Sequence, residues 1–465
     1  MSRDLSVEHA ATELHDARSP VERVASSTLT LDVVVVASVA LVLGLIRLGT
    51  PSFWVDEAFT AWRTEQSYAE LIEGYHWLYQ TIVNLWATFA GTSEWSLRVP
   101  SVVGAMLACA LLVVLARMFF ERRVALLSGL LLATSPFLVK WSQQARGYTL
   151  LVALSVLSWI LLVRALDRGS RPAWALYGLA FAAVVVWHPI AGALLVPAQL
   201  VLAAQRRDRL LPHGLLAAVI VLALGGMWAG QILERSTGEG PGGVDWLTTP
   251  SPETAARTFL DVSGAGGLGA VLGVAGSVVL WRVGRTAVAA WLAAWAVAPF
   301  VLALLALPLK PLFLDRYLIT AAPAFALLGG VALGSLRLRP QTVALAVVML
   351  ASALGLAQWY SSAEPNGNWR GENWRAAVRE VLDRREANEP ILMVPWSVRQ
   401  AAMYYGLEDP VPTSAAPSVW AVTWSEEGRE LTPEERSLVE AGGRQLVERL
   451  QFGRRVTIQR WQREE

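Results

Sequence analysis

The chain has 465 residues, of which 54% are hydrophobic and only 17% are charged, and its formal net charge is +1. Soluble domains carry about a quarter charged residues, so this composition indicates a membrane protein. The near-neutral charge excludes bulk nucleic-acid binding, and the single cysteine, Cys109, excludes a disulfide within the chain.

Residues 1–30 are mostly polar and of mixed charge, without the basic-then-apolar layout of a cleavable signal peptide. We expect a short cytoplasmic tail, followed by the uncleaved signal anchor LDVVVVASVALVLGLIRLGT. An apolar run of about 20 residues crosses the bilayer hydrocarbon as a helix. The sequence predicts eleven such spans, at 31–49, 99–119, 124–140, 148–166, 173–187, 190–204, 211–231, 264–281, 286–307, 317–335 and 340–360.

The segments between the predicted spans alternate in charge. Arginine gathers in every second one, at 121–123, 164–172, 205–209, 281–285 and 335–340. By the positive-inside rule these segments face the cytoplasm. The segments between them then face outward, at 50–98, 141–147, 188–189, 232–262 and 308–316, and so do residues 361–465.

Residues 75–91, YHWLYQTIVNLWATFAG, are apolar enough to be considered as a further span. On a helical wheel His76, Gln80 and Asn84 share one side. Large apolar residues share the other side, namely Leu78, Ile82, Leu85, Trp86 and Phe89. This pattern predicts an amphipathic helix lying in the membrane interface, so the outer loop 50–98 stays whole.

Residues 361–465 alternate between helix-like and strand-like patterns. ENWRAAVREVLDRRE and TPEERSLVEAGGRQLVERLQF predict helices, and ILMVP, VWAVTW and RVTIQRW predict strands. The predicted fold is therefore a polytopic α-helical membrane domain over 31–360, followed by a small extracytoplasmic α/β domain over 361–465.

Two adjacent carboxylates, Asp56 and Glu57, follow the first span among aromatic residues. They open a short predicted helix, DEAFTAWRTEQ, whose N-terminal dipole favours an ionised carboxylate. Such a group can act as a general base toward a hydroxyl. The alternative is that both acids only cap the helix and face water.

Cations on the predicted outer face form a second set of candidates: Arg98, Arg146, Lys310 and Arg316. Arginine binds a phosphate through two N–H groups, and Tyr148 stands beside Arg146. Alternatively, Arg98 snorkels at the interface and Asp315 pairs with its neighbour Arg316. For His188, packing or hydrogen bonding is the favoured interpretation. Motifs for ATP, NAD or thiol redox chemistry are absent from the sequence.

The ordered series FWVDEAFT, YHWLYQTIVNLW, SEWSLRVPSVVGA, SPFLVKWSQQARGYTLLVAL and DRYLITAAPAFALLGGVAL resembles the GT-C membrane glycosyltransferases. The resemblance is to bacterial relatives of the protein O-mannosyltransferases and the lipid A aminoarabinose transferase. It is densest over about 45–165 and returns at 310–335.

This resemblance implies a multi-pass protein of the bacterial plasma membrane that uses a polyprenyl-phosphate sugar donor and a hydroxyl acceptor at the outer face. The implied reaction is a single inverting displacement, with Asp56 as base or acceptor-positioning group and Glu57 beside it. It also implies that Arg98 and Arg146 support the site and that Arg316 contacts the donor phosphate. With Tyr148, Lys310, His76 and Tyr79, these are the predicted donor- and substrate-binding residues.

The chain departs from the family pattern at two places. His76-Trp77-Leu78-Tyr79 replaces His-Pro-Pro-Leu-Tyr, and Gln144 replaces a glutamate. The loss of that carboxylate weakens a metal site, so no metal ligands are assigned and a divalent metal is left open. Two other functions stay as alternatives. A transporter or flippase is expected to have internal repeats and polar residues in the middle of its spans. The sequence shows no internal repeat and few such polar residues. A non-catalytic binder of lipid-linked sugars is favoured by Gln144.

Overall fold

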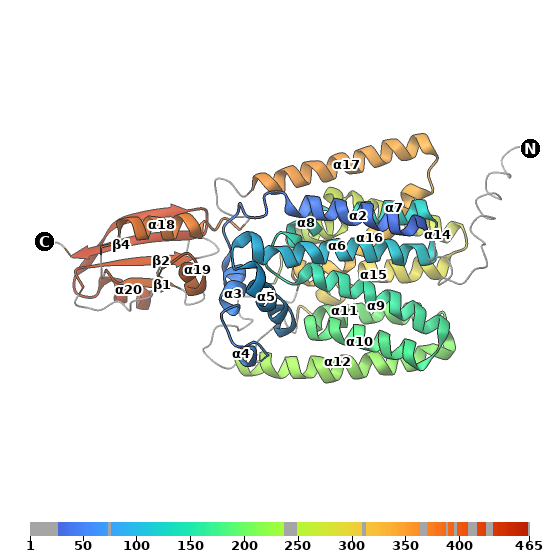
Figure 1. Cartoon of the computed structure of the whole chain (residues 1–465), viewed down its shortest axis with the longest axis horizontal. Coiled ribbons are helices and arrows are strands. Elements are labelled where there is room, and N and C mark those ends of the chain that lie inside the picture. Colours follow the sequence, from blue (N-terminus) through green and yellow to red (C-terminus); the bar gives the residue numbers. More distant parts are fainter. Residues whose placement is uncertain are drawn as a thin grey trace, which may run out of the picture.

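The computed structural model describes residues 27–72, 76–236, 249–308, 313–362, 370–386, 389–394, 398–407, 416–424 and 431–463. Lys310 lies outside these ranges. A helical bundle forms one end of the molecule and a small sheet with helices forms the other (Figure 1). The short helices that follow the first apolar helix lie between the two parts (Figure 1).

The bundle consists of long helices that run along the length of the molecule, with shorter helical pieces at their ends (Figure 1). They are α2 Ser27–Leu45, α6 Glu94–Phe119, α7 Arg122–Ala133, α8 Pro136–Ser142, α9 Tyr148–Arg168, α10 Arg171–Trp187, α11 Pro189–Ala203, α12 Arg207–Ser236, α13 Pro252–Ser263, α14 Leu268–Arg282, α15 Thr286–Leu305, α16 Ala322–Gly334 and α17 Leu338–Ser361. Three 3-10 turns accompany them: η2 Ala265–Gly267, η3 Asp315–Tyr317 and η4 Ile319–Ala321.

All eleven predicted spans fall on helices, but the count of eleven is not confirmed. Within the described ranges, seven helices are long and apolar enough to cross a membrane, or eight if the bent pair α7–α8 is one span. The helices α10 and α11 and the helical stretch Ile319–Gly334 are apolar but shorter. The axes of α7 and α8 meet at 57°. Pro136 explains the break, because it has no N–H to donate and disfavours a helical conformation at the preceding residue.

A cluster of tryptophans lies in the bundle core. Trp159, Trp291 and Trp295 are fully buried, and the Trp159 ring lies 5.2 Å and 4.8 Å from the rings of the other two. Helices α6 and α9 approach closely at Gly104, where a Cβ atom would lie 2.6 Å from the backbone nitrogen of Leu150. The helices are therefore held by tight apolar packing, as in other membrane bundles.

The arginine-rich segments meet at one end of the bundle. Four side-chain contacts join them: Arg206 to Asp167, Gln205 to Ala287, Arg285 to Phe120 and Arg123 to Leu336. Arg122 pairs there with Asp32 near the start of α2, at 2.9 Å. The start of α2 lies at the end of the bundle away from the sheet (Figure 1). The segments predicted to face the cytoplasm thus share one end, opposite to that of the short helices.

The short helices are α3 Val55–Arg63, α4 Tyr68–Ile72 and α5 Trp77–Ala90. Helix α5 is not among the candidate spans, in agreement with the predicted amphipathic helix. Its apolar residues Leu85 and Phe89 are 52% and 82% exposed, whereas Asn84 is buried. The Asn84 amide donates a hydrogen bond to the carbonyl oxygen of Thr64 at 2.9 Å. The polar side of α5 therefore faces the protein, and its apolar side faces outward.

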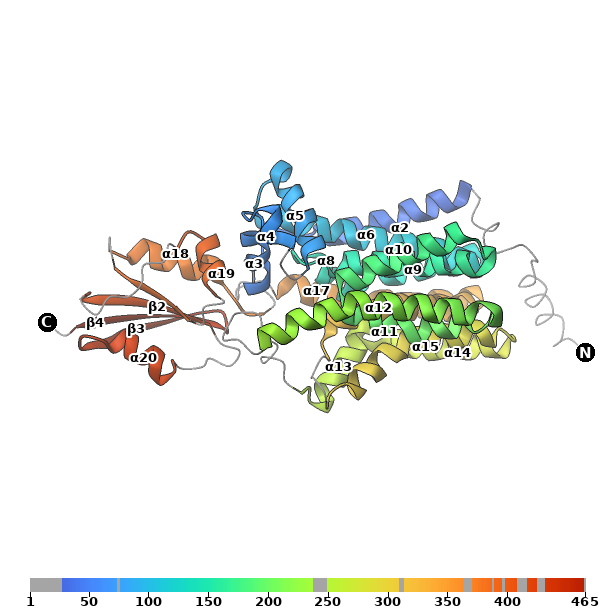
Figure 2. The ribbon, with the colours of Figure 1, turned by 90° about the horizontal axis from the view of Figure 1, so that it is seen from below.

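The C-terminal part contains α18 Trp374–Arg384, β1 Ile391–Val394, α19 Arg399–Tyr404, β2 Ser418–Trp424, α20 Pro433–Glu440, β3 Arg444–Phe452 and β4 Val456–Arg463. The strands form one mixed sheet in the order β1-β2-β4-β3. Helices α18 and α20 lie on opposite sides of these strands (Figure 2). Strands β1 and β2 are parallel, with Leu392 opposite Ala421. Strand β4 runs antiparallel to both β2 and β3, and Val422 lies opposite Ile458.

The single helix predicted over 432–452 is wrong. Helix α20 ends at Glu440, and residues 444–452 form strand β3. Gly442 and Gly443 adopt φ values of 77° and 78°, a left-handed conformation that ends a helix at little cost for glycine. The other strands and helices predicted after residue 361 correspond to α18, β1, β2 and β4.

Candidate active site

Asp56 lies in the first turn of α3, where the backbone N–H groups point toward the N-terminal end of the helix. Its side chain is 33% exposed. Arg146 approaches it from the turn between α8 and α9, with its Nη2 atom 3.8 Å from the Asp56 Oδ2 atom. Arg146 Nη1 also donates to the backbone oxygen of Asp56 at 3.4 Å. Two residues predicted for the site are therefore brought together, and the carboxylate stays accessible.

Glu57 differs from Asp56 because it points into the protein. Its carboxylate is 1% exposed and accepts two hydrogen bonds from Arg98, from Nε at 2.7 Å and from Nη2 at 2.8 Å. The other Arg98 donors bind backbone oxygens of residues 48, 51 and 52, so all five N–H groups of this guanidinium have acceptors. Arg98 is therefore occupied inside the protein, whereas the sequence-based prediction assigned it to the donor phosphate.

The turn that carries Arg146 is fixed on both sides. The backbone N–H of Ala145 donates to Glu57 Oε1 at 2.8 Å. The indole N–H of Trp187 donates to the carbonyl oxygen of Gly147, also at 2.8 Å. Glu57 thus connects the start of α3 to the Arg146 turn and contributes to the relative placement of Asp56 and Arg146.

A second arginine reaches the same region from η3. Arg316 is only 6% exposed, and its guanidinium carbon lies 5.7 Å from the Tyr317 ring centre. Burial lowers the pKa of Arg316 and of Arg146, but Tyr148 and Asp56 outweigh it and raise both pKa values above the ordinary range. Both arginines are therefore cationic and lie within electrostatic reach of Asp56.

Asp315 does not depend on its neighbour Arg316 for an ion pair. Its Oδ2 atom accepts from Lys140 Nζ at 2.9 Å, and its Oδ1 atom accepts from the backbone N–H of Arg316 at 2.8 Å. Although burial raises the pKa of Asp315, Lys140 and then Arg316 lower it below the ordinary value. Lys140 was not predicted as a site residue, because it lies within an apolar run.

Aromatic and imidazole rings surround Arg146. The cavity they form has a volume of only about 10 Å³ and is lined by His76, Tyr79, Arg146, Gly147, Tyr148, Trp187 and His188. The rings of His76 and His188 lie 5.7 Å apart, and His188 Nδ1 accepts from the backbone N–H of Ala191. Burial and then the charge of Arg146 lower the pKa of His76 to about 4. Burial and then His76 lower that of His188, so both imidazoles are neutral at pH 7.

Two residues near the site were missed by sequence analysis. The guanidinium carbon of Arg370 lies 4.3 Å from the ring centre of Trp54, which precedes α3. Burial and then the charge of Arg316 lower the pKa of Arg370, while Asp56 raises it, so Arg370 belongs to the same electrostatic cluster. Glu372 accepts from the backbone N–H of Val55 at 3.1 Å. Arg370 comes from the polar stretch 361–371, and Glu372 is the first residue of the helix predicted from ENWRAAVREVLDRRE.

The residue at the second family departure turns away from solvent. Gln144 is buried, and its amide donates to the backbone oxygen of Lys140 at 3.0 Å. Within the described part of the chain, no three His, Cys, Asp or Glu side chains gather in a way that could hold a metal ion. The divalent metal left open by the sequence therefore has no ligand set to assign here.

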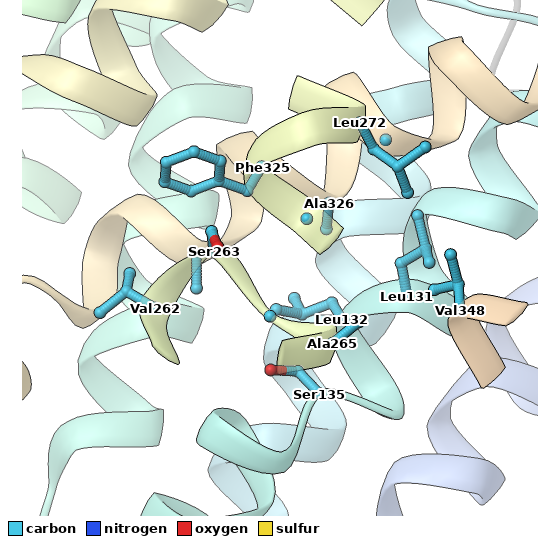
Figure 3. Close-up of a pocket in the computed structure, with 14 residues that line it drawn as sticks. Leu131, Leu132, Ser135, Val262, Ser263, Ala265, Leu272, Phe325, Ala326 and Val348 are labelled. Atoms are coloured by element: carbon cyan, nitrogen blue, oxygen red, sulfur yellow. The ribbon is translucent and has the colours of Figure 1, made fainter. Parts of the chain in front are cut away.

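A separate apolar pocket lies inside the bundle (Figure 3). It has a volume of about 20 Å³ and is lined only by apolar residues, glycines and serines of α7, η2 and the helices around them. Ser135, Val262, Ala265 and Phe325 lie on its wall (Figure 3). Asp56 and the three arginines do not line this pocket, so it is distinct from the charged site.

Comparison with known proteins identifies the fold. Residues 75–228 match the family model described as dolichyl-phosphate-mannose-protein mannosyltransferase. No curated protein matches the chain.

Among solved structures, ArnT from Cupriavidus metallidurans is similar in its apo state, with a TM-score of 0.65, 16% sequence identity and coverage of 93% of this chain and 98% of ArnT. ArnT bound to undecaprenyl phosphate gives a TM-score of 0.62, also at 16% identity, over 94% of this chain and 98% of that one. The Archaeoglobus fulgidus oligosaccharyltransferase in complex with Zn and sulfate gives 0.52 at 14% identity, over 83% and 67% of the two chains. The chain therefore has the fold of the GT-C glycosyltransferases and resembles ArnT and the protein mannosyltransferases, as the sequence predicted.

Proposed function

We propose that this protein transfers a sugar from a polyprenyl-phosphate donor to a hydroxyl group of a glycan, lipid or protein at the outer face of the bacterial plasma membrane. The observation that carries the proposal is an accessible carboxylate, Asp56, paired with Arg146 and interacting electrostatically with Arg316 and Arg370. An acid that accepts a proton beside cations that bind a phosphate is what such a transfer requires. The undecaprenyl phosphate bound to ArnT supports a lipid-linked donor.

In the proposed mechanism, the Asp56 carboxylate removes the proton of the acceptor hydroxyl as the hydroxyl oxygen attacks the anomeric carbon. The bond between this carbon and the phosphate oxygen breaks, and its electron pair stays on the phosphate. The leaving polyprenyl phosphate gains negative charge, which the arginines stabilise because they are already cationic and held in place. Attack opposite to the leaving group inverts the anomeric configuration.

The remaining candidates have supporting roles in this proposal. Tyr148 lies 5.9 Å from the Arg146 guanidinium and keeps it oriented through a cation–π contact. His76 and Tyr79 line the same cavity and would contact the substrate as neutral groups. Glu57 and Arg98 act indirectly, by holding α3 against the Arg146 turn. Lys310 remains a candidate for the donor phosphate on sequence grounds alone.

The proposed orientation rests on charge. The arginine-rich segments gather at the end of the bundle away from the sheet, which favours that end as the cytoplasmic one. Asp56 and the C-terminal part then lie outside. A single cysteine introduced at exposed Glu434, with buried Cys109 as the only other thiol, tests this. A membrane-impermeant maleimide should label it in intact cells, and labelling only after lysis would contradict the orientation.

The test of the function uses purified protein in lipid nanodiscs. A panel of polyprenyl-phosphate sugars is supplied with an envelope extract as acceptor, and free polyprenyl phosphate is measured by mass spectrometry. Wild type should release it from at least one donor, and Asp56→Asn should not. The matched control is Glu65→Gln, which removes an exposed carboxylate of the same loop. Release from no donor at all would refute the proposal and favour a transporter or a non-catalytic binder.

A further inference from the structure

The backbone that leads into Asp56 is bound by the C-terminal part of the chain. Arg375 donates to the carbonyl oxygen of Thr50 at 3.1 Å. The Ser52 hydroxyl donates to the backbone oxygen of Glu372 at 2.8 Å. The Phe53 N–H donates to the Tyr405 hydroxyl at 2.7 Å, which in turn donates to Glu94 at 3.0 Å. Residues 50–55 are thus fixed from a part of the chain more than three hundred positions away.

Glu372 makes the contact nearest to Asp56. Its Oε2 atom accepts from the backbone N–H of Val55, the first residue of α3, at 3.1 Å. The same oxygen accepts from the Trp374 indole at 2.9 Å, and the residue is fully buried. The first N–H groups of a helix have no partner within the helix, so an acceptor at this position stabilises the helix start. A carboxylate there also interacts favourably with the helix dipole.

We infer that Glu372 is a positioning residue for the proposed base: it caps α3 from outside and thereby sets where the Asp56 carboxylate lies relative to Arg146. The inference deepens the proposed function and rests on it. Arg98 holds the backbone of the same segment from the bundle side, through the carbonyl oxygens of Leu48 and Pro51. The start of α3 is therefore held between α6 and the C-terminal part, and both contacts determine where Asp56 lies.

The geometry of this contact predicts different activities for two substitutions of Glu372. In Glu372→Gln, the amide oxygen can replace Oε2 and accept from both Val55 and Trp374. We therefore expect sugar transfer within a few-fold of wild type. In Glu372→Ala, the cap is lost and α3 is free to shift. Misplacement by about 1 Å can cost about a hundredfold in rate, so we expect kcat to fall about 10- to 100-fold. The KM for the donor should change less than kcat, because Arg146 and Arg316 are untouched and only Arg370 loses an electrostatic partner.

The matched control is Tyr404→Phe. The Tyr404 hydroxyl donates to the backbone oxygen of Thr92 at 2.9 Å, so this variant also removes one hydrogen bond between the C-terminal part and the bundle side. The bond does not reach α3, and the ring contact with Phe53 at 4.7 Å is kept. Tyr404→Phe should keep its kcat, which distinguishes loss of the α3 cap from general loosening of the C-terminal part.

Hydrogen exchange of the peptide covering residues 50–63 provides a readout that does not need activity. In Glu372→Ala this peptide should take up deuterium faster, while in Glu372→Gln and Tyr404→Phe it should match wild type. Unchanged exchange, or faster exchange with an unchanged kcat, would overturn the inference. An equal fall of kcat in the alanine and control variants would also overturn it. If wild type transfers no sugar, the proposed function fails, while the exchange measurement still decides whether Glu372 holds α3.

Discussion

The clearest prediction concerns the buried pair of Glu57 and Arg98 and is tested by Glu57→Gln. Each carboxylate oxygen accepts from one Arg98 nitrogen and from one backbone N–H, of Ala145 on Oε1 and of Trp54 on Oε2. Whichever oxygen becomes an amide nitrogen, two donors lose their acceptor. A buried unsatisfied donor costs about 1–3 kcal/mol. This agrees with the cost of about 3–5 kcal/mol for removing one partner of a buried ion pair.

The assay is denaturant unfolding in detergent micelles, followed by tryptophan fluorescence, for wild type, Glu57→Gln, Arg98→Met and the double variant. We expect each single variant to lose about 3–5 kcal/mol of unfolding free energy. The double variant should lose less than the two losses added together, by about 1–3 kcal/mol, because neither charge is left alone. The reasoning is refuted if Glu57→Gln unfolds like wild type but transfers no sugar. Glu57 would then be the reacting carboxylate.

Three further predictions concern the Arg146 cavity. Arg146→Lys should weaken polyprenyl-phosphate binding about tenfold, because lysine lacks the planar pair of donors. An unchanged Kd for polyprenyl phosphate would exclude a phosphate contact at Arg146. His76→Gln should leave the shape of the activity profile between about pH 5.5 and 8 unchanged. The reason is that His76 gains a proton only as the pH falls through about 4, and loss of an acidic limb near pH 6–7 would contradict this. Gly147→Ala should abolish sugar transfer and cost about 1–3 kcal/mol of unfolding free energy. The reason is that the added Cβ would lie 2.7 Å from Trp187 Nε1 and 2.9 Å from Tyr79 Cδ2. Full activity at wild-type stability would show that the cavity wall can adapt.

The helices and the general place of the site could be predicted from the sequence, because apolar run length and arginine bias depend on local composition. The same bias placed Asp56, Arg146 and Arg316 on one face, and the structure brings them together. The sequence could not show which of Asp56 and Glu57 faces the site. Adjacent helical residues point in different directions, and tertiary packing determines which one points inward. The Arg98 contacts explain that selection.

The contribution of the C-terminal part could not be predicted at all. Glu372 and Val55 are 317 positions apart, and neither a helical nor a strand period connects them. Arg370 stands in a short polar stretch that is typical of a linker, and Glu372 stands at the start of a predicted helix. Only their tertiary contacts with Trp54 and Val55 indicate a role at the site. Strand β3 was missed for a different reason. Its residues also suit a helix, and the two preceding glycines decide the outcome.

The contact between Glu372 and α3 also has a consequence for biosynthesis. Chains are made from the N-terminus, so Asp56 enters the membrane region long before Glu372 leaves the ribosome. While Glu372 is still missing, the Val55 N–H has no acceptor from the C-terminal part and the start of α3 is held only from the bundle side. The catalytic geometry would then form only in the completed chain. A nascent or prematurely terminated chain would be inserted in the membrane but inactive. Incomplete chains would therefore not consume lipid-linked sugars.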